Sequence, residues 1–217
     1  MTAEVPARRR GRPPASEASP GETRERIQQA ARELFAEKGF HATSVSEIGD
    51  RAGIQRGALY YHIGSKEELL FQIRRNYTQL ILDDVARITD AGGEPIAMLR
   101  NLIRSHVRLI VEHRHDVTIA LRDAGALTGE RAADLQELRD GIQRRWQRVF
   151  DDGYAAGVLR TNDHVVTLST VAMLNMVSAW YHADGEYGPD QIADVLTGTI
   201  LDGVAAPTAH PSKATKG

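Results

Sequence analysis

The chain has 217 residues, 41% of them hydrophobic and 26% charged, which is typical of a globular protein with room for one small domain and one larger one. It contains no cysteine, so disulfide bonds, thiolate zinc sites and cysteine nucleophiles are excluded. The formal net charge of −2 conceals an asymmetry, because residues 1 to 66 hold 11 basic and 8 acidic residues while the rest hold 16 and 21. This modest basic excess at the N-terminal end is compatible with a nucleic-acid partner but does not identify one.

No run of apolar residues approaches the ~18 that a membrane-spanning helix needs. The basic residues Arg8, Arg9 and Arg10 are not followed by the apolar stretch of a secretory signal. We therefore expect a cytoplasmic protein without a membrane partner.

Residues 1 to 20 are rich in Pro, Ala, Arg and Glu and offer almost no apolar anchor, so we expect a disordered basic arm. Within it, Arg10-Gly11-Arg12-Pro13 matches the core of an AT-hook, in which Arg10 and Arg12 enter a narrow A·T-rich minor groove. The alternative is a solvated tail that touches phosphates from no fixed position.

The pattern from residue 21 to residue 63 predicts three helices. The first covers residues 21 to 38, and Gly39 ends it. Ser44, with Glu47 three residues later, forms a capping-box pattern that opens a second short helix, which Gly53 ends. A third helix over about 55 to 63 buries Leu59 and leaves several polar and aromatic side chains without a place in a core. This order is that of a helix-turn-helix DNA reader.

The remainder of the chain is also predicted to be helical, so the fold class is all-α. A long helix starts at the Ser65 cap, carries its apolar residues on one stripe and ends before Gly92-Gly93, and Pro95 opens the next. Further helices are expected at about 116 to 124, 130 to 156, 163 to 183 and 189 to 205. The short connections between them imply antiparallel neighbours.

The last two expected helices are apolar around much of their circumference, so they must be buried on two sides. They either pack inside one monomer or form half of an intermolecular four-helix bundle. We favour the homodimer, because two major-groove helices one helical turn apart, ~34–36 Å, are best presented by a two-fold dimer.

Catalytic patterns are missing from the sequence: it has no glycine-rich phosphate loop, no Gly-x-Ser-x-Gly, no His-Glu-x-x-His and no calcium-loop motif. Neither an enzyme nor a cofactor is therefore predicted. His113 and His115, with His106 before them, are the one dense group of histidines. Because they lie near an expected helix end, where histidine meets the helix dipole, we favour a structural role over a metal site.

Six segments between residues 23 and 70 carry a resemblance to a known family: Ala30-Ala31-Arg32-Glu33-Leu34-Phe35, Lys38-Gly39-Phe40, Thr43-Ser44-Val45, Ala52-Gly53-Ile54, Gly57-Ala58-Leu59-Tyr60-Tyr61-His62 and Ser65-Lys66-Glu67-Glu68-Leu69-Leu70. In this order they resemble the DNA-binding domain of the TetR family of bacterial transcription regulators. Ile63 departs from the family's usual Phe, and Ala58 from a common Thr or Ser. The resemblance implies a three-helix DNA-binding domain at 21–66, a larger helical effector-binding and dimerisation domain at 67–205, and a disordered tail at 206–217.

The same resemblance implies which residues touch operator DNA. Arg56, Gly57 and Tyr60 would face base edges, with Gln55 at the entry of their helix, and Arg56 is suited to bidentate contact with guanine. A phosphate clamp would be formed by Ser44, Ser46, Tyr61, His62 and Lys66. The complete set of expected DNA contacts is Arg10, Arg12, Ser44, Ser46, Gln55, Arg56, Gly57, Ala58, Tyr60, Tyr61, His62 and Lys66. The alternative for the two tyrosines is that one of them packs beneath the helix.

The larger domain is expected to bind a small-molecule effector. Its candidate contacts are polar or aromatic residues on otherwise apolar faces: His106, Arg122, Trp146, Phe150, Met173, Asn175 and Trp180. Each of them could equally be an ordinary core or interface residue. The segment from Trp146 to Tyr181 loosely resembles lipid- and sterol-catabolism repressors that sense acyl-CoA thioesters, which makes a long, partly anionic effector a leading hypothesis, with Arg122 or Arg104 as partner for its charge. A hydrophobic drug or an antibiotic intermediate is the alternative effector.

Three functions from different classes remain open on sequence alone. A ligand-responsive regulator, most simply a repressor, predicts one palindromic operator and release by a small molecule. A nucleoid-type architectural protein, suggested by the arginine hook, predicts binding with little sequence preference. An enzyme or ligand carrier with a vestigial DNA domain predicts an activity that survives loss of Arg56.

Overall fold

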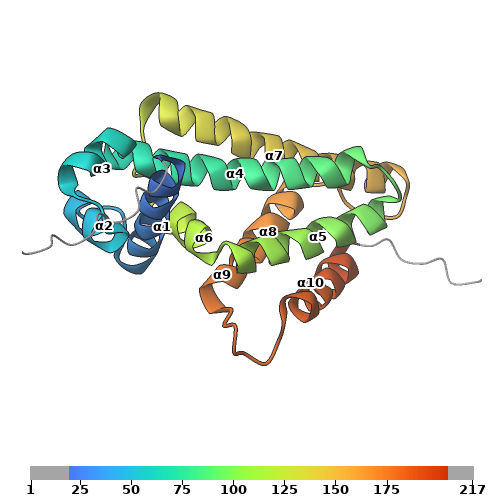
Figure 1. The fold of residues 1–217 in the computed structure, drawn as a ribbon. Helices are drawn as coiled ribbons and strands as arrows, with labels where there is room; N and C mark the ends of the chain where they lie inside the picture. The colour runs from blue at the N-terminus through green and yellow to red at the C-terminus, as the bar shows by residue number, and fades with distance from the viewer. Residues whose placement is uncertain (1–19, 205–217) are drawn as a thin grey trace, which may run out of the picture.

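The computed structural model describes residues 20–204, and these residues form ten helices. They are α1 (Pro20–Lys38), α2 (Val45–Ala52), α3 (Arg56–Ile63), α4 (Lys66–Asp90), α5 (Pro95–Glu112), α6 (Arg114–Arg122), α7 (Gly129–Ala155), α8 (His164–Asn175), α9 (Val177–Trp180) and α10 (Pro189–Val204). The all-α prediction is confirmed. Figure 1 shows α1, α2 and α3 together at one end, with α4 leading away from them beside α7.

The expected helix signals at the N-terminal end are all present. Ser44 and Glu47 form the capping box of α2, and Gly53 ends that helix in the left-handed conformation with φ of 67°. Gly39, with φ of 93°, follows α1 directly. Ser65 caps α4 by accepting a hydrogen bond from the amide of Glu68. These local patterns set the end of α1, both ends of α2 and the start of α4.

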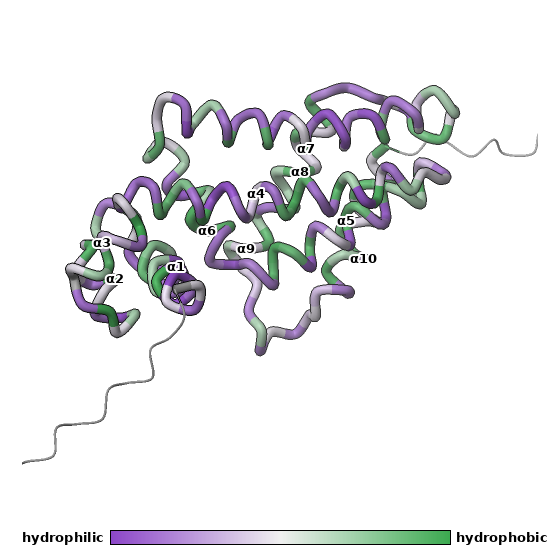
Figure 2. Tube along the Cα trace, turned by 45° about the horizontal axis from the view of Figure 1, so that its top comes forward, coloured by the Kyte–Doolittle hydropathy of each residue, from purple (hydrophilic) through white to green (hydrophobic). Residues whose placement is uncertain are grey.

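Two hydrophobic cores hold the fold together. One is built from α1 to α3 and the start of α4, and it also takes in Ile119 of α6 and Leu135 of α7. The other lies among α4, α5, α7, α8 and α10, with Trp146 and Phe150 fully buried at its centre. Figure 2 shows hydrophobic residues concentrated on α5 and α8, whereas hydrophilic residues recur along α7. No helix within residues 20–204 is long and apolar enough to cross a membrane.

The single helix expected at 163 to 183 is wrong, because the chain breaks at Met176 into α8 and the short α9. The carbonyl of Asn175 is taken by the hydroxyl of Ser178 at 2.8 Å, and the amide of Ala179 bonds instead to Met176 at 3.0 Å. Tyr181 is extended and ends α9. The Ser178 hydroxyl thus competes with the backbone amide of Ala179 for the carbonyl oxygen of Asn175, which interrupts the helical hydrogen bonds.

Candidate DNA interface and effector cavity

The recognition helix α3 is anchored by its apolar residues and turns the rest outward. Leu59 and Ile63 are buried, whereas Tyr60 is 44% exposed and Tyr61 88% exposed. Neither tyrosine therefore packs beneath the helix, because Leu59 and Ile63 already occupy that position. Tyr61 and His62 meet edge to face, with ring centroids 5.4 Å apart. The exposed face of α3 is free to enter a groove.

Two glycines allow other groups to approach the backbone around α3, Gly57 in α3 itself and Gly49 in α2. A Cβ added at Gly57 would meet no atom within 4 Å, so this position leaves open space in front of the helix. Gly49, which the sequence reading did not single out, lies under the turn, where an added Cβ would stand 3.1 Å from the carbonyl oxygen of Ile54 and 3.3 Å from Leu59. Its missing side chain lets α2 and α3 contact each other.

The remaining expected DNA contacts lie around α3. Gln55 and Ala58 are exposed on α3 or at its entry, and Ser46 is exposed on α2. Arg56 is the first residue of α3. Arg10 and Arg12, the expected AT-hook residues, lie outside the described residues.

Ser44 is held by the capping box rather than free. Its hydroxyl donates to Glu47 Oε2 at 2.9 Å and accepts from the Glu47 amide at 3.2 Å. A hydrogen bond from Lys38 and those from the Ser44 backbone and side chain lower the pKa of Glu47 to about 2. The box therefore carries a fixed negative charge at the start of α2, which the helix dipole favours.

Lys66 does not point into solvent as a phosphate clamp would. Its Nζ donates to the carbonyl oxygens of Phe40 and Thr43, both at 2.9 Å, and lies 4.3 Å from the centre of the Phe40 ring. The side chain thus ties the start of α4 to the loop between α1 and α2. This corrects the expectation that Lys66 is presented to DNA, because two of its three donors are already used inside the protein.

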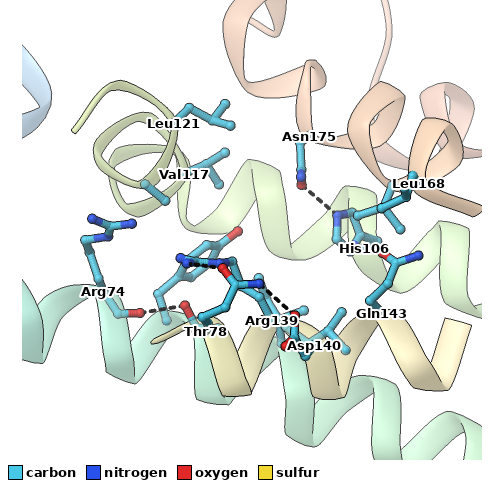
Figure 3. Close-up of a pocket in the computed structure, with 16 residues that line it drawn as sticks. Arg74, Thr78, His106, Val117, Leu121, Arg139, Asp140, Gln143, Leu168 and Asn175 are labelled. Carbon is cyan, nitrogen blue, oxygen red and sulfur yellow. Dashed lines mark hydrogen bonds between the residues drawn. The ribbon is translucent and has the colours of Figure 1, made fainter. Parts of the chain in front are cut away.

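A cavity of about 360 Å³ lies among α4, α5, α6, α7 and α8. Most of the surface of its walls is apolar, although half of its lining residues are polar or charged, and Figure 3 shows several of these around it. The lining residues are Arg74, Tyr77, Thr78, Ile81, His106, Val117, Ala120, Leu121, Gln136, Arg139, Asp140, Ile142, Gln143, Leu168, Val171 and Asn175. A concave apolar space with few polar groups is the usual form of a small-molecule site.

Two of the seven expected effector contacts line this cavity. His106 and Asn175 do so, and His106 Nε2 lies 2.9 Å from Asn175 Oδ1 (Figure 3). Burial lowers the pKa of His106, outweighing the hydrogen bond with Asn175, so its imidazole is held neutral. The ring also meets Trp146 edge on, with centroids 5.9 Å apart.

The other five expected contacts lie elsewhere. Trp146 and Phe150 fill the core completely, while Met173 and Trp180 are 40% and 50% exposed. Arg122 points toward α1, where its guanidinium donates to the carbonyl oxygen of Phe35. None of these five lines the cavity. This corrects the expectation for Arg122, because its charge is used to hold α6 against α1.

Arg104, the other expected partner for an effector charge, is also placed away from the cavity. It lies on the exposed side of α5 and forms an ion pair of 2.6 Å with Asp194 of α10. Among the lining residues that sequence reasoning missed are Tyr77 and Gln143. Tyr77 was hidden in the apolar stripe of α4, and Gln143 precedes Trp146 by one turn on α7. Burial raises the pKa of Tyr77.

The cavity and the DNA reader share α6. Val117, Ala120 and Leu121 line the cavity, whereas Ile119 is buried in the core of the reader. Asp116 at the start of α6 forms an ion pair of 3.1 Å with Arg32 of α1.

The end of α6 makes a second contact with the reader. The carboxylate of Asp123 accepts a hydrogen bond of 3.2 Å from the backbone amide of Phe40. The buried guanidinium of Arg74 in α4 donates to the Asp123 carbonyl at 2.9 Å. The cavity lining is therefore connected to the reader through α6 as well as through α4.

Metal-binding groups do not assemble around the histidines. Within the described residues no group of three His, Asp or Glu side chains is arranged to hold a metal ion. His113 Nδ1 lies 3.7 Å from Asp116, while His106 is buried with Asn175.

These features define a helix-turn-helix DNA-binding protein with a second helical part that contains a ligand-sized cavity. Family comparisons identify the class more closely. Residues 27–73 match the model of bacterial regulatory proteins of the tetR family, and residues 92–204 match the tetracyclin repressor-like C-terminal domain. The chain belongs to the TetR family, and it is a transcriptional regulator rather than an enzyme.

Its relatives include characterised repressors. The HTH-type transcriptional repressor KstR2 of Mycolicibacterium smegmatis is 29% identical over 195 residues, which cover 88% of this chain and 95% of that protein. The ketosteroid transcriptional regulator KstR2 of Mycobacterium tuberculosis has a similar structure, with a TM-score of 0.79 and 25% identity over 89% of this chain and 98% of that one. The structure of AibR in complex with isovaleryl coenzyme A and operator DNA gives a TM-score of 0.76 and 27% identity, covering 83% and 98% of the two chains.

Proposed function

We propose that the protein is a ligand-responsive repressor. It binds a palindromic operator as a homodimer and leaves it when a small hydrophobic or acyl-CoA-like effector fills the cavity. The observation that carries this proposal is that α4 and α6 wall the cavity and also hold the DNA reader in place.

The DNA contacts follow from the exposed face of α3. Gln55, Arg56, Gly57 and Tyr60 approach base edges, and Arg56 discriminates guanine by ~1–3 kcal/mol if it makes a bidentate contact. Phosphates are contacted by residues around this face, namely Ser46, Tyr61 and His62. The exposure of Tyr61 and of Ser46 supports this assignment.

The dimer forms through α8, α9 and α10. Val165, Met176, Trp180 and Val195 are each at least half exposed, although all are large and apolar. Residues 165, 169 and 172 of α8 share the spacing of one helix face, which continues to Met176 directly after the helix, and all four are exposed. An apolar face of this kind on a monomer indicates a protein partner, and the DNA-binding geometry requires a second copy of the chain.

Introducing one charged residue into the proposed interface tests whether the dimer forms there. Val195→Glu places a carboxylate on the proposed interface, so light scattering after size exclusion should find a monomer where the wild type is a dimer. Leu80→Glu is the matched control, because Leu80 is 38% exposed on α4. If Val195→Glu stays dimeric, the interface is on another face.

Release from DNA depends on α4 and α6, the two helices that contact both the cavity and the DNA reader. An effector that needs more space between α4 and α6 favours the state in which the contacts of Asp116 with Arg32 and of Asp123 with Phe40 are shifted. The recognition helices of the dimer then no longer match successive major grooves. The effector changes DNA affinity only by its preference between the two states, typically ~1–3 kcal/mol.

The apolar lining and two of the comparisons support the effector class. AibR is described in complex with isovaleryl coenzyme A, and KstR2 as a ketosteroid regulator. The isovaleryl group and a ketosteroid both have apolar carbon skeletons. Such skeletons suit the cavity walls formed by Ile81, Val117, Ile142, Leu168 and Val171.

The decisive experiment is to select genomic fragments with the purified protein and to footprint the best one at fixed salt. We expect one protected palindrome that is lost with Arg56→Ala and kept with Arg100→Ala, a control on the exposed side of α5. Diffuse protection that is indifferent to Arg56→Ala would contradict operator recognition and favour an architectural DNA-binding protein.

A further inference from the structure

Arg74 is a buried cation in the wall of the cavity, and no carboxylate of the described residues forms an ion pair with it. Only 4% of its surface is exposed. Its Nη1 atom lies 2.9 Å from the backbone carbonyl oxygen of Asp123 and 3.4 Å from that of Ala124, and it donates to both. Proteins rarely bury a guanidinium without a counter-charge, because its hydration is lost. The fold thus satisfies part of this group with neutral carbonyls and supplies no paired anion.

A second arginine adds to the positive charge near Arg74. Arg139 of α7 also lines the cavity, and it donates to the neutral side chain of Gln136 at 2.8 Å. Burial and the charge of Arg139 lower the pKa of Arg74, and the carboxylate of Asp123 offsets only part of this effect. That carboxylate accepts a hydrogen bond of 3.2 Å from the backbone amide of Phe40, on the side of the DNA reader. The two guanidinium groups therefore repel each other in the cavity wall.

The other titratable groups of the lining do not balance the two arginines. Among the described lining residues, Asp140 alone is acidic, and its carboxylate accepts from Gln136 at 2.6 Å instead of pairing with an arginine. His106 is neutral, because burial lowers its pKa. The lining therefore holds two positive charges and one negative charge, an excess of one positive charge. A ligand with a single negative charge would balance it.

Arg74 also keeps donors that a ligand can reach. Its Nε and Nη2 atoms have no hydrogen-bond partner among the described residues, yet they are not fully enclosed by protein as the Tyr77 hydroxyl and the Gln143 amide nitrogen are. Figure 3 shows Arg74 on α4 directed toward the helix that carries Val117 and Leu121, which is α6. The planar guanidinium matches the two oxygen atoms of a carboxylate.

We propose that the effector is an apolar molecule with one carboxylate, and that Arg74 and Arg139 bind this carboxylate in the part of the cavity next to α6. The apolar part of the effector lies against Ile142, Leu168 and Val171. The inference rests on the proposed function in taking the cavity as the effector site. It adds the charged group of the effector and the two residues that recognise it.

Matched ligands isolate the carboxylate. Calorimetry without DNA should find that decanoate binds about tenfold more tightly than methyl decanoate, in which the ester keeps the chain and removes the charge. Abietate against methyl abietate makes the same comparison for a rigid ring skeleton. Decylamine, which carries the opposite charge on the same chain, should not bind. Equal binding of acid and ester in both pairs, or binding by neither pair, would overturn the proposal.

Two variants test the arginines. Arg74→Gln and Arg139→Gln should each weaken binding of the preferred acid about tenfold and leave binding of its methyl ester unchanged. Arg75→Gln is the matched control, because Arg75 is exposed on α4 and pairs with Asp134 outside the cavity. Arg139 is exposed, so its variant should fold even if Arg74→Gln does not. Unchanged affinity for the acid in Arg139→Gln would by itself overturn the proposal.

Decanoyl-CoA distinguishes a carboxylate from a phosphate as the bound anion. It has the same chain but no carboxylate, so we expect its affinity to be the same in Arg139→Gln as in the wild type. Tighter binding than decanoate, together with a tenfold loss in Arg139→Gln, would show that the arginine meets a phosphate and would overturn the proposal.

Operator footprinting of the same preparations tests the proposed function separately. If the acid binds through the two arginines but does not release the operator, the carboxylate site stands and the effector role of the cavity fails. If a neutral compound releases the operator from Arg74→Gln and Arg139→Gln as it does from the wild type, the repressor function stands and the carboxylate site fails.

Discussion

Lys66 offers a direct test of whether a cation beside the recognition helix serves DNA or the fold. In Lys66→Met the apolar stem remains, but the two hydrogen bonds of 2.9 Å to Phe40 and Thr43 are lost. Hydrogen bonds to a charged group contribute ~1.5–3 kcal/mol each, and the contact with the Phe40 ring adds ~0.5–1 kcal/mol. Ordering a lysine side chain costs up to ~2 kcal/mol. With the low end of the hydrogen-bond and ring-contact ranges and the full ordering cost, we expect a net loss of about 1.5 kcal/mol.

Such a loss corresponds to a fall in melting temperature of roughly 3–6 °C for a chain of this size. Urea unfolding would measure it, with Lys38→Met as control, since Lys38 forms only an exposed pair with Glu47. A phosphate contact would have another signature, because each one contributes ~0.9 to the slope of log affinity against log salt. Unchanged stability together with a shallower salt slope in Lys66→Met would refute the structural role and restore the phosphate contact.

Three further predictions concern other parts of the molecule. The pKa of Glu47 is depressed from 4.5 to about 2, so the charged carboxylate stabilises the fold fully above pH 4.5, and this stabilisation is lost as the pH falls through about 2. The difference in free energy of unfolding between the wild type and Glu47→Gln should therefore disappear over that pH interval in acid titrations of unfolding. Gly153→Ala would place a Cβ 2.6 Å from Leu159 and should lower the free energy of unfolding by about 1–3 kcal/mol in urea titrations. Asp116→Asn removes the ion pair with Arg32, so it should keep operator affinity but reduce the effector-induced loss of binding in an anisotropy titration.

The parts of the fold that could be predicted from the sequence are those set by near neighbours along the chain. The box at Ser44 and Glu47, the turn at Gly53 and the cap at Ser65 each depend on residues within one helical turn, and all of them are present. The break at Met176 was missed, because a hydroxyl that takes one carbonyl leaves the apolar periodicity of the segment unchanged.

The effector cavity was harder to predict, because which side of a helix faces a void depends on packing between distant segments. His106 and Asn175 were found as polar residues on apolar faces, but Trp146 has the same pattern and is fully buried in the core. Arg122 and Lys66 were misassigned for a related reason. Their partners are backbone carbonyls, and Phe35 lies 87 residues from Arg122, so no residue type marks the contact in the sequence.

The short helix α6 belongs both to the wall of the cavity and to the core of the DNA reader. Successive residues of an α-helix are turned by about 100°, so Val117 and Leu121 lie on one side and Ile119 lies on the other. Val117 and Leu121 line the cavity, and Ile119 is fully buried in the core of the DNA reader. Because close-packed cores do not deform continuously, a ligand that displaces the first side must also repack the second. The proposed coupling between effector and operator therefore requires no separate pathway beyond one helix with its two faces in two different environments.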